Sequence, residues 1–345
     1  MTTPDLQEPT RDPPGLELDR LADYLAAKAP GLVTPPFKAE LIAGGRSNLT
    51  YVLKDIYVLR RPPLGHVLAT AHDMSREFKV ISGLAATPVP VPEALLLCED
   101  DSVLGAPFYL MSRVPGTVYR RIEQTDPLGA EVRRKLAFEM MDTLAALHAV
   151  DPAAVGLGDF GRPDGFLERQ VRRWAAQLDR SRSRDLAGAG ALHDRLAATI
   201  PTSTRTAIVH GDFRLDNVLI GDDLRINAVL DWEMSTLGDP LSDVALMLVY
   251  AGLPLQVSDG HATVPLEVPG HPTLRDLSSR YADRSGRDVS DLHWYVAFAA
   301  FKLAVILEGV HYRYVQGQTV GEGFETIGNL VGPLVMRGHE ALEGN

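Results

Sequence analysis

The sequence has a single cysteine among its 345 residues, Cys98. One cysteine excludes an intramolecular disulfide, so the fold must depend on packing and hydrogen bonding. Cys98 ends the apolar run 94–98. This position predicts a buried structural thiol rather than a reactive one.

Positive charge and long hydrophobic runs are also scarce. There are 34 basic and 45 acidic residues, a formal net charge of −11. That balance argues against broad nucleic-acid binding, although it leaves room for a local basic pocket for phosphates. The longest apolar stretch, 295–307, is interrupted by Lys302, and it is shorter than the roughly 20 residues that span a bilayer. Because the N-terminus lacks the features of a signal peptide, we expect a cytoplasmic protein with no membrane partner.

The most informative stretch of the chain is 208–233. Two apolar runs flank the turn 221–223, a pattern that predicts a β-hairpin. Asn217 and Asp231 lie about seven residues on either side of position 224, so both should sit at the open end of the hairpin. Asp212 lies on the loop that enters it. The hairpin therefore predicts that two carboxylates and one amide converge on one spot.

These three side chains suit phosphoryl transfer. A carboxylate and an amide oxygen are ligands for a hard cation such as Mg²⁺. A further aspartate nearby can orient a hydroxyl and accept its proton. Together they could move a phosphoryl group from Mg-ATP to an alcohol. An isolated His-Gly-Asp could equally be a tight turn after a strand, but Asn217 and Asp231 at these offsets favour the catalytic interpretation.

The pattern His-Gly-Asp-x4-Asn (210–217), followed by Leu-Asp-Trp-Glu (230–233), resembles the aminoglycoside phosphotransferase family of protein-kinase-like small-molecule kinases. The resemblance implies a bilobal α+β fold, with a five-stranded antiparallel sheet and a helix in the N-lobe and a mostly helical C-lobe. It also implies that Asp212 is the catalytic aspartate, that Asn217 and Asp231 bind Mg²⁺, and that ATP is the donor. The segments 58–63, 72–77 and 169–174 look like the branch that includes the kinase-like domain of acyl-CoA dehydrogenase fusion proteins.

Alternating apolar patterns predict the N-lobe strands, and helical spacing of apolar residues predicts two helices, 17–28 and 72–86. The strands are expected at 38–43, 49–53, 56–60, 94–98 and 108–111. Gly44, Gly45, Ser47 and Asn48 lie between the first two strands. Glycines let the backbone approach a phosphate, and the two polar side chains could donate to its oxygens. A plain hairpin turn is the alternative, whereas in the family such a loop covers the ATP phosphates.

Arg60 ends the third strand, where kinases carry a phosphate-binding lysine. Arginine can pair with phosphates but is not equivalent to lysine. Glu77 occupies the place of the kinase glutamate and is expected to pair with Arg60. The alternative for Arg60 is a surface position at the end of a strand, and the alternative for Glu77 is an exposed carboxylate on a helix. Strand alternation predicts that Arg61 points to the opposite face.

The expected domain organisation is a tail, an N-lobe, a hinge and a C-lobe, at 1–16, 17–111, 112–116 and 117–345. The hinge backbone should bind the adenine edge, with Met111 and Val114 lining the base pocket. Plain core packing is the alternative for Met111. Helical periodicity predicts C-lobe helices at 131–150, 165–179, 191–199, 291–314 and 322–343. A further buried helix is expected to open at 238–243, with Pro240 in its first turn, and to run through 250.

Two C-lobe residues are expected to be structural. His148, near the end of one helix, is interpreted as a packed or capping histidine. By resemblance, Asp243 holds the catalytic loop through its backbone.

The acceptor is expected to be a small molecule with a hydroxyl group. An aminoglycoside is polycationic and would need carboxylates, for which the candidates are Glu233, Asp239 and Glu308. An anionic acceptor such as a hydroxyacyl-CoA would suit basic residues, for which the candidates are Arg172, Arg173, His311 and Arg313. Solvated helix faces are the alternative for all of these charges.

Other interpretations remain open. The chain could phosphorylate a choline-like, homoserine-like or sugar alcohol. A nucleotide-binding pseudokinase is supported by Arg60 and opposed by the intact Asp212, Asn217 and Asp231. A protein kinase is disfavoured because no activation-segment motif follows Asp231. GTP in place of ATP, and a monomer or a homodimer, are also open.

Overall fold

The computed structural model describes residues 12–32, 35, 37–42, 48–64, 73–120, 122–202, 206–251, 272–319 and 324–344. Contacts within the chain divide it into two compact units. Unit 1 comprises Met1–Ala85 and Val91–Val114, and unit 2 comprises Ala86–Pro90 and Pro115–Asn345. The boundary after Val114 falls inside 112–116, and the hinge role of that segment stays a prediction.

Unit 1 contains a five-stranded antiparallel sheet with the strand order β1-β2-β3-β5-β4. Its strands are β1 (Ala39–Leu41), β2 (Leu49–Leu53), β3 (Tyr57–Arg61), β4 (Ala94–Cys98) and β5 (Phe108–Ser112). Every predicted strand is present, and no bound differs by more than two residues. Arg60 pairs with Tyr109 across β3 and β5, so these side chains share one face of the sheet.

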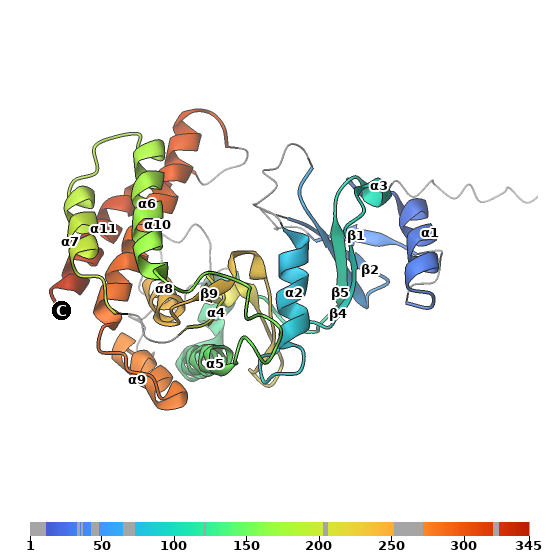
Figure 1. The fold of residues 1–345 in the computed structure, drawn as a ribbon, viewed down its shortest axis with the longest axis horizontal. Helices are drawn as coiled ribbons and strands as arrows, with labels where there is room; N and C mark the ends of the chain where they lie inside the picture. The colour runs from blue at the N-terminus through green and yellow to red at the C-terminus, as the bar shows by residue number, and fades with distance from the viewer. Residues whose placement is uncertain are drawn as a thin grey trace, which may run out of the picture. The chain divides into compact units, whose positions relative to one another are not determined.

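The two faces of this sheet are covered by different helices (Figure 1). Helix α2 (Met74–Leu84) covers one face, and it begins after Asp73, whose side chain accepts a hydrogen bond from the Arg76 N–H at 3.1 Å. Helix α1 (Leu18–Lys28) and the short α3 (Asp101–Leu104) cover the other. The sequence analysis placed no helix between the strands 94–98 and 108–111; instead, the Asp100 side chain accepts from the Ser102 N–H and starts α3.

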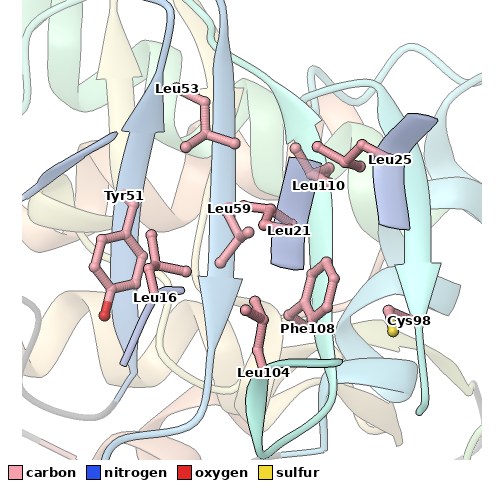
Figure 2. Close-up of a cluster of buried hydrophobic side chains, with 10 residues drawn as sticks. All are labelled: Leu16, Leu21, Leu25, Tyr51, Leu53, Leu59, Cys98, Leu104, Phe108 and Leu110. Atoms are coloured by element: carbon pink, nitrogen blue, oxygen red, sulfur yellow. The ribbon is translucent and has the colours of Figure 1, made fainter. Parts of the chain in front are cut away.

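The core of unit 1 lies between α1 and the sheet (Figure 2). Its buried members are Leu16, Leu21, Leu25, Tyr51, Leu53, Leu59, Cys98, Leu104, Phe108 and Leu110. Cys98 is buried here, as predicted. Arg61 follows Leu59 by two residues and reaches the same side, where it donates to the carbonyls of Gly15 and Leu104. Alternation therefore turns Arg60 to the α2 face, as predicted for the two arginines.

Unit 2 is mostly helical, with two short β-ribbons. Its helices are α4 (Ile122–Thr125), α5 (Gly129–Ala149), α6 (Phe166–Ser181), α7 (Ala189–Ala198), α8 (Leu241–Ala251), α9 (Leu274–Ser285), α10 (Leu292–Val315) and α11 (Val331–Leu342). The ribbons pair β6 (Ala207–Val209) with β9 (Thr236–Gly238), and β7 (Val218–Ile220) with β8 (Ile226–Val229). Single 3-10 turns lie at Asp126–Leu128, Leu215–Asn217, Trp232–Met234 and Ile327–Leu330.

Helix α10 packs against α6, α8 and α11 and forms the centre of unit 2. It is long and apolar enough to cross a membrane by length and composition, but 67% of its most apolar window is buried. A core helix has the same properties, so its length is weak evidence for a membrane span.

Two helical predictions for unit 2 need correction. Helix α9 was not predicted, because its charged composition hides the apolar stripe that buries only Leu277 and Tyr281. Its start carries a capping box, in which Thr273 and Asp276 exchange side-chain and backbone hydrogen bonds. The last helix was predicted from 322, but α11 begins only at Val331, after a 3-10 turn.

Candidate active site

The two ribbons of unit 2 place the predicted site residues at the ends of paired strands. In the β7–β8 hairpin Val218 lies opposite Val229, and the Leu230 N–H donates to the Asn217 carbonyl at 2.8 Å. Asn217 and Asp231 therefore flank the open end of the hairpin, as the sequence predicted. Strand β6 leads into the segment that carries Asp212. It pairs with β9, which follows Asp231, so the second ribbon holds the chain before Asp212 beside the chain after Asp231.

Asn217 connects directly to Asp212. Its Nδ2 donates to the Asp212 carbonyl at 2.9 Å and to the Asp212 Oδ2 at 3.1 Å. Since a carbonyl only accepts, the amide nitrogen must face Asp212. The amide oxygen, Oδ1, is then the Asn217 atom left to face a cation.

Asp231 has a left-handed backbone, with φ 66° and ψ 60°. Few residues other than glycine adopt this conformation, and aspartate is among those that tolerate it. Strained backbone of this kind clusters at functional sites. The next residue, Trp232, is buried, and its indole N–H donates to the Val229 carbonyl at 3.0 Å. The buried indole anchors the turn that carries the Asp231 carboxylate.

His210 links the loop of Asp212 to the strand of Asp231. Its Nε2 donates to the Leu230 carbonyl at 2.8 Å, so its Nδ1 is free of hydrogen and accepts from the Asp212 N–H at 3.2 Å. The ring is fully buried against Trp232, with 4.7 Å between ring centroids. One imidazole therefore ties together the two segments that carry the site carboxylates.

Asp243, at the start of α8, holds the same loop by its backbone. One carboxylate oxygen accepts from the His210 N–H at 2.6 Å and the other from the Gly211 N–H at 2.8 Å. Gly211 has φ +85°, and a Cβ there would lie 2.7 Å from the Met234 carbonyl oxygen. Only glycine fits that approach. The structural role predicted for Asp243 is confirmed.

His148 supports Asp243 from α5. Its Nδ1 lies 2.8 Å from the Tyr281 hydroxyl and its Nε2 3.4 Å from Asp243 Oδ2. Burial lowers the pKa of His148, and the hydrogen bond and charge of Asp243 only partly oppose it. Burial alone would raise the pKa of Asp243, but the hydrogen bonds from His148 and the Gly211 N–H help to outweigh it, and that pKa is lowered. His148 is thus packed, as predicted, and neutral beside an ionised carboxylate.

Three residues that contact Asp212 or its loop had no predicted role. Arg214 Nε lies 3.6 Å from Asp212 Oδ2, and the guanidinium also pairs with Asp216. The Tyr250 hydroxyl donates to Asp212 Oδ1 at 3.4 Å. Burial lowers the pKa of Arg214, but Asp212, Tyr250 and Asp216 together outweigh it and raise that pKa. Burial and the charge of Asp212 raise the pKa of Tyr250. The third is Lys302, whose isolated charge in an apolar run was the only sequence signal.

In unit 1, the pairing predicted for Glu77 is confirmed. The Arg60 Nε lies 3.2 Å from Glu77 Oε2, and the fully buried carboxylate also accepts from the Tyr109 hydroxyl at 3.0 Å and from Asn48 Nδ2 at 3.2 Å. Burying a carboxylate is unfavourable unless charged and polar partners surround it. Glu77 therefore fixes Arg60 and Asn48 in place.

The remaining nucleotide-binding predictions stay untested. Gly44, Gly45 and Ser47 lie outside the described residues. Met111 pairs with Val58 and so shares the sheet face of Arg60. Val114 is half-buried at the end of unit 1.

Two carboxylates proposed for a cationic acceptor are structural instead. Asp239 accepts from the Tyr295 hydroxyl at 2.8 Å and from the Leu241 N–H at 3.0 Å. Glu308 is fully buried and accepts from the Ser183 N–H at 3.0 Å, its hydroxyl at 2.7 Å and Arg184 at 3.2 Å. Both carboxylates are therefore hydrogen-bonded to partners inside unit 2. The third candidate, Glu233, is half-buried.

The basic residues proposed for an anionic acceptor are more accessible. Arg172, Arg173 and Arg313 are exposed, whereas His311 is half-buried. The Arg173 guanidinium lies 5.7 Å from the centre of the Trp174 ring.

The described part of the chain contains no group of three or more His, Cys, Asp or Glu side chains that could bind a metal ion. Mg²⁺ commonly takes only one or two protein ligands and completes its shell with water and substrate phosphates. Asn217 and Asp231 fit that kind of site.

Comparison with known proteins gives the family. A model of the phosphotransferase enzyme family matches residues 38–277. Acyl-CoA dehydrogenase family member 10 of Mus musculus is 35% identical over 333 residues, which cover 93% of this chain and 31% of the relative. A solved structure from Ralstonia eutropha, assigned provisionally as an aminoglycoside phosphotransferase, is 32% identical with TM-score 0.82 and covers 95% of this chain and 98% of that one.

The chain belongs to the phosphotransferase enzyme family. The resemblance to aminoglycoside phosphotransferases and the likeness to the acyl-CoA dehydrogenase branch are both confirmed. The GDP complex of aminoglycoside 2'-phosphotransferase-IIIa shares the protein-kinase-like fold at 12% identity, with TM-score 0.63 over 96% of this chain and 100% of that one. This phosphotransferase spans only about a third of the mouse relative, so the activity of the whole relative does not carry over.

The buried His148 predicts a pH dependence of stability. Its folded-state pKa is lowered, while an unfolded histidine titrates near pH 6.5. Below about pH 6.5 the histidine of the unfolded chain binds a proton, whereas His148 of the folded chain does not. The free energy of unfolding therefore decreases as the pH drops below about 6.5, by up to about 1.4 kcal/mol per pH unit. We expect the difference in unfolding free energy between wild type and His148→Gln, measured in urea, to shrink from pH 7.5 to 5.5. Parallel curves would contradict a neutral His148.

Proposed function

We propose that this phosphotransferase transfers the γ-phosphoryl group of Mg-ATP to a hydroxyl of a small molecule. The observation that carries the proposal is the Asp212 carboxylate, bonded to Asn217 at the open end of the hairpin whose other strand leads to Asp231. A carboxylate, an amide and a second carboxylate in this arrangement suit in-line phosphoryl transfer.

Asp212 would act on the acceptor. Its carboxylate orients the hydroxyl and takes its proton as the oxygen–phosphorus bond forms and the bond to the β-phosphate oxygen breaks, so that ADP leaves. Tyr250 and Asn217 hydrogen-bond to separate oxygens of this carboxylate, Oδ1 and Oδ2, and restrict its rotation. Such pre-orientation accounts for much of the rate in reactions of this type.

Asn217 Oδ1 and the Asp231 carboxylate would hold Mg²⁺. When bound, the ion neutralises charge on the phosphoryl oxygens. The left-handed backbone of Asp231 and the Nδ2 bonds of Asn217 fix both donors beforehand.

Arg60 would bind the nucleotide phosphates. The ion pair with Glu77 holds its guanidinium, so little side-chain entropy is lost on binding. Asn48 is held by the same carboxylate, and Met111 and Val114 are proposed to contact the base. The GDP complex of the aminoglycoside 2'-phosphotransferase-IIIa neighbour supports nucleotide use in this fold. ATP rather than GTP, and a cytoplasmic location, are part of the proposal.

The acceptor is proposed to be an alcohol that is not polycationic. Two carboxylates that could have bound amines, Asp239 and Glu308, are occupied by internal partners. The acyl-CoA dehydrogenase relatives favour a hydroxyacyl-CoA as the first acceptor class to test.

Replacing Asp212 tests the reaction. We expect Asp212→Asn to lower acceptor-dependent turnover about 10²- to 10⁴-fold, because an amide cannot accept the hydroxyl proton. Purified wild type and variant would receive Mg-ATP or Mg-GTP with hydroxyacyl-CoAs, aminoglycosides and small alcohols, and mass spectrometry would detect phosphorylated products. Asp222→Asn, at the exposed turn of the same hairpin, is the matched control and should match wild type. Equal product from wild type and Asp212→Asn would contradict the proposal, and tight Mg-ATP binding with no product from the panel would favour a pseudokinase.

Glu77→Gln tests the anchoring of Arg60. Loss of the ion pair leaves the guanidinium free to turn away from the phosphates, and a hydrogen bond to a charged group such as a phosphate contributes about 1.5–3 kcal/mol. We expect the Kd for Mg-ATP, measured by calorimetry, to rise roughly 10- to 100-fold. Glu99→Gln removes an exposed carboxylate that accepts from Ser75 and should leave the Kd unchanged. A Kd for Glu77→Gln equal to that of wild type would show that the ion pair does not contribute to nucleotide affinity.

A further inference from the structure

Lys302 is a cation in the middle of an apolar helix. Within 295–307 it is the only charged residue. Its neighbours on α10, including Ala300, Phe301, Leu303 and Ala304, are buried. A lysine amid apolar packing loses hydration, and a hydrophobic side chain of similar volume would normally be as stable or more stable there.

The Lys302 ammonium faces the catalytic loop. Its Nζ donates to the Gly211 carbonyl at 3.3 Å and lies 5.6 Å from the centre of the Trp174 ring on α6. Burial lowers the pKa of Lys302, and the charges of Asp212 and Asp243 oppose that effect. The contacts show that the side chain is directed at the peptide preceding Asp212.

That peptide is held at both ends. The Gly211 carbonyl accepts from Lys302, and the N–H of the same peptide unit, from Asp212, donates to His210 Nδ1 at 3.2 Å. The preceding N–H groups are held by Asp243. Rotation of the Gly211–Asp212 peptide plane would break the Lys302 and His210 bonds together. Where the rotation is not compensated at the N–Cα bond of Asp212, it would also swing the Cα–Cβ bond of Asp212.

We propose that Lys302 is a positioning residue, which locks the Gly211–Asp212 peptide plane and thereby aims the Asp212 carboxylate at the acceptor hydroxyl. The proposal rests on the catalytic role of Asp212 given above. It accounts for the single charged residue in the otherwise apolar run 295–307. Misplacement of a reacting group by about 1 Å can cost on the order of 100-fold in rate.

The test is Lys302→Met, which keeps the side-chain length and removes the donor. We expect a melting temperature equal to or above that of wild type and an unchanged KM for ATP. We expect kcat to fall roughly 10- to 100-fold. With the acceptor class unassigned, the activity is measured as Mg-ATP hydrolysis, in which water takes the place of the alcohol. Lys135→Met is the matched control, since Lys135 also donates to a backbone carbonyl, that of Asp223 at 3.0 Å, at the far end of the hairpin.

The outcomes separate this proposal from the proposed function. Hydrolysis by Asp212→Asn equal to that of wild type would refute the role of Asp212 itself. If Asp212→Asn is inactive but Lys302→Met turns over like wild type, only the positioning role fails. A lower melting temperature with an unchanged kcat would show a purely structural lysine. Crystal structures of wild type and Lys302→Met give a reading independent of activity: the Gly211 carbonyl should turn away from position 302, and an unmoved peptide plane would overturn the proposal.

Discussion

The Asp243 carboxylate is the constraint on which the site depends. It accepts two consecutive backbone N–H groups, from His210 and Gly211, and so forces the chain into a turn that only glycine can make. Deeply buried, the carboxylate would be unfavourable without those donors and His148. Its desolvation is offset by the bonds that shape the loop. Folding of α8 and formation of the loop that carries Asp212 are therefore coupled.

The same turn explains why the reactive groups need little adjustment. His210 connects the turn to Leu230, one residue before Asp231, and Asn217 bonds to both the backbone and the carboxylate of Asp212. Every link is a hydrogen bond between buried or partly buried groups, where the low local dielectric strengthens it. In unit 1, Glu77 performs the equivalent task for Arg60. Both units use one buried acidic side chain to orient the polar groups proposed to meet the nucleotide or the acceptor.

Much of this could be predicted from the sequence, because it follows from local patterns. The β7–β8 hairpin and the strands of unit 1 depend on alternation and turn residues. The Arg60–Glu77 pair was predicted from the resemblance to kinases. Helix α9 was missed because it is polar and marked mainly by the Thr273–Asp276 capping box. Asp239 accepts a hydrogen bond from Tyr295, and Glu308 accepts one from Arg184. These contacts depend on packing between segments distant in the sequence, which motif spacing does not encode. Lys302 was visible in the sequence as an isolated charge in an apolar run. Its partner was not, because the Gly211 carbonyl lies 91 residues away.

The central claim is that Asp212, Asn217 and Asp231 form one phosphoryl-transfer site. A crystal structure with Mg²⁺ and a non-hydrolysable ATP analogue tests it most directly. The account predicts the metal on Asn217 Oδ1 and the Asp231 carboxylate, with the terminal phosphoryl group facing Asp212. A nucleotide and metal bound without contact to Asn217 and Asp231, in crystals that hold the nucleotide at full occupancy, would contradict it.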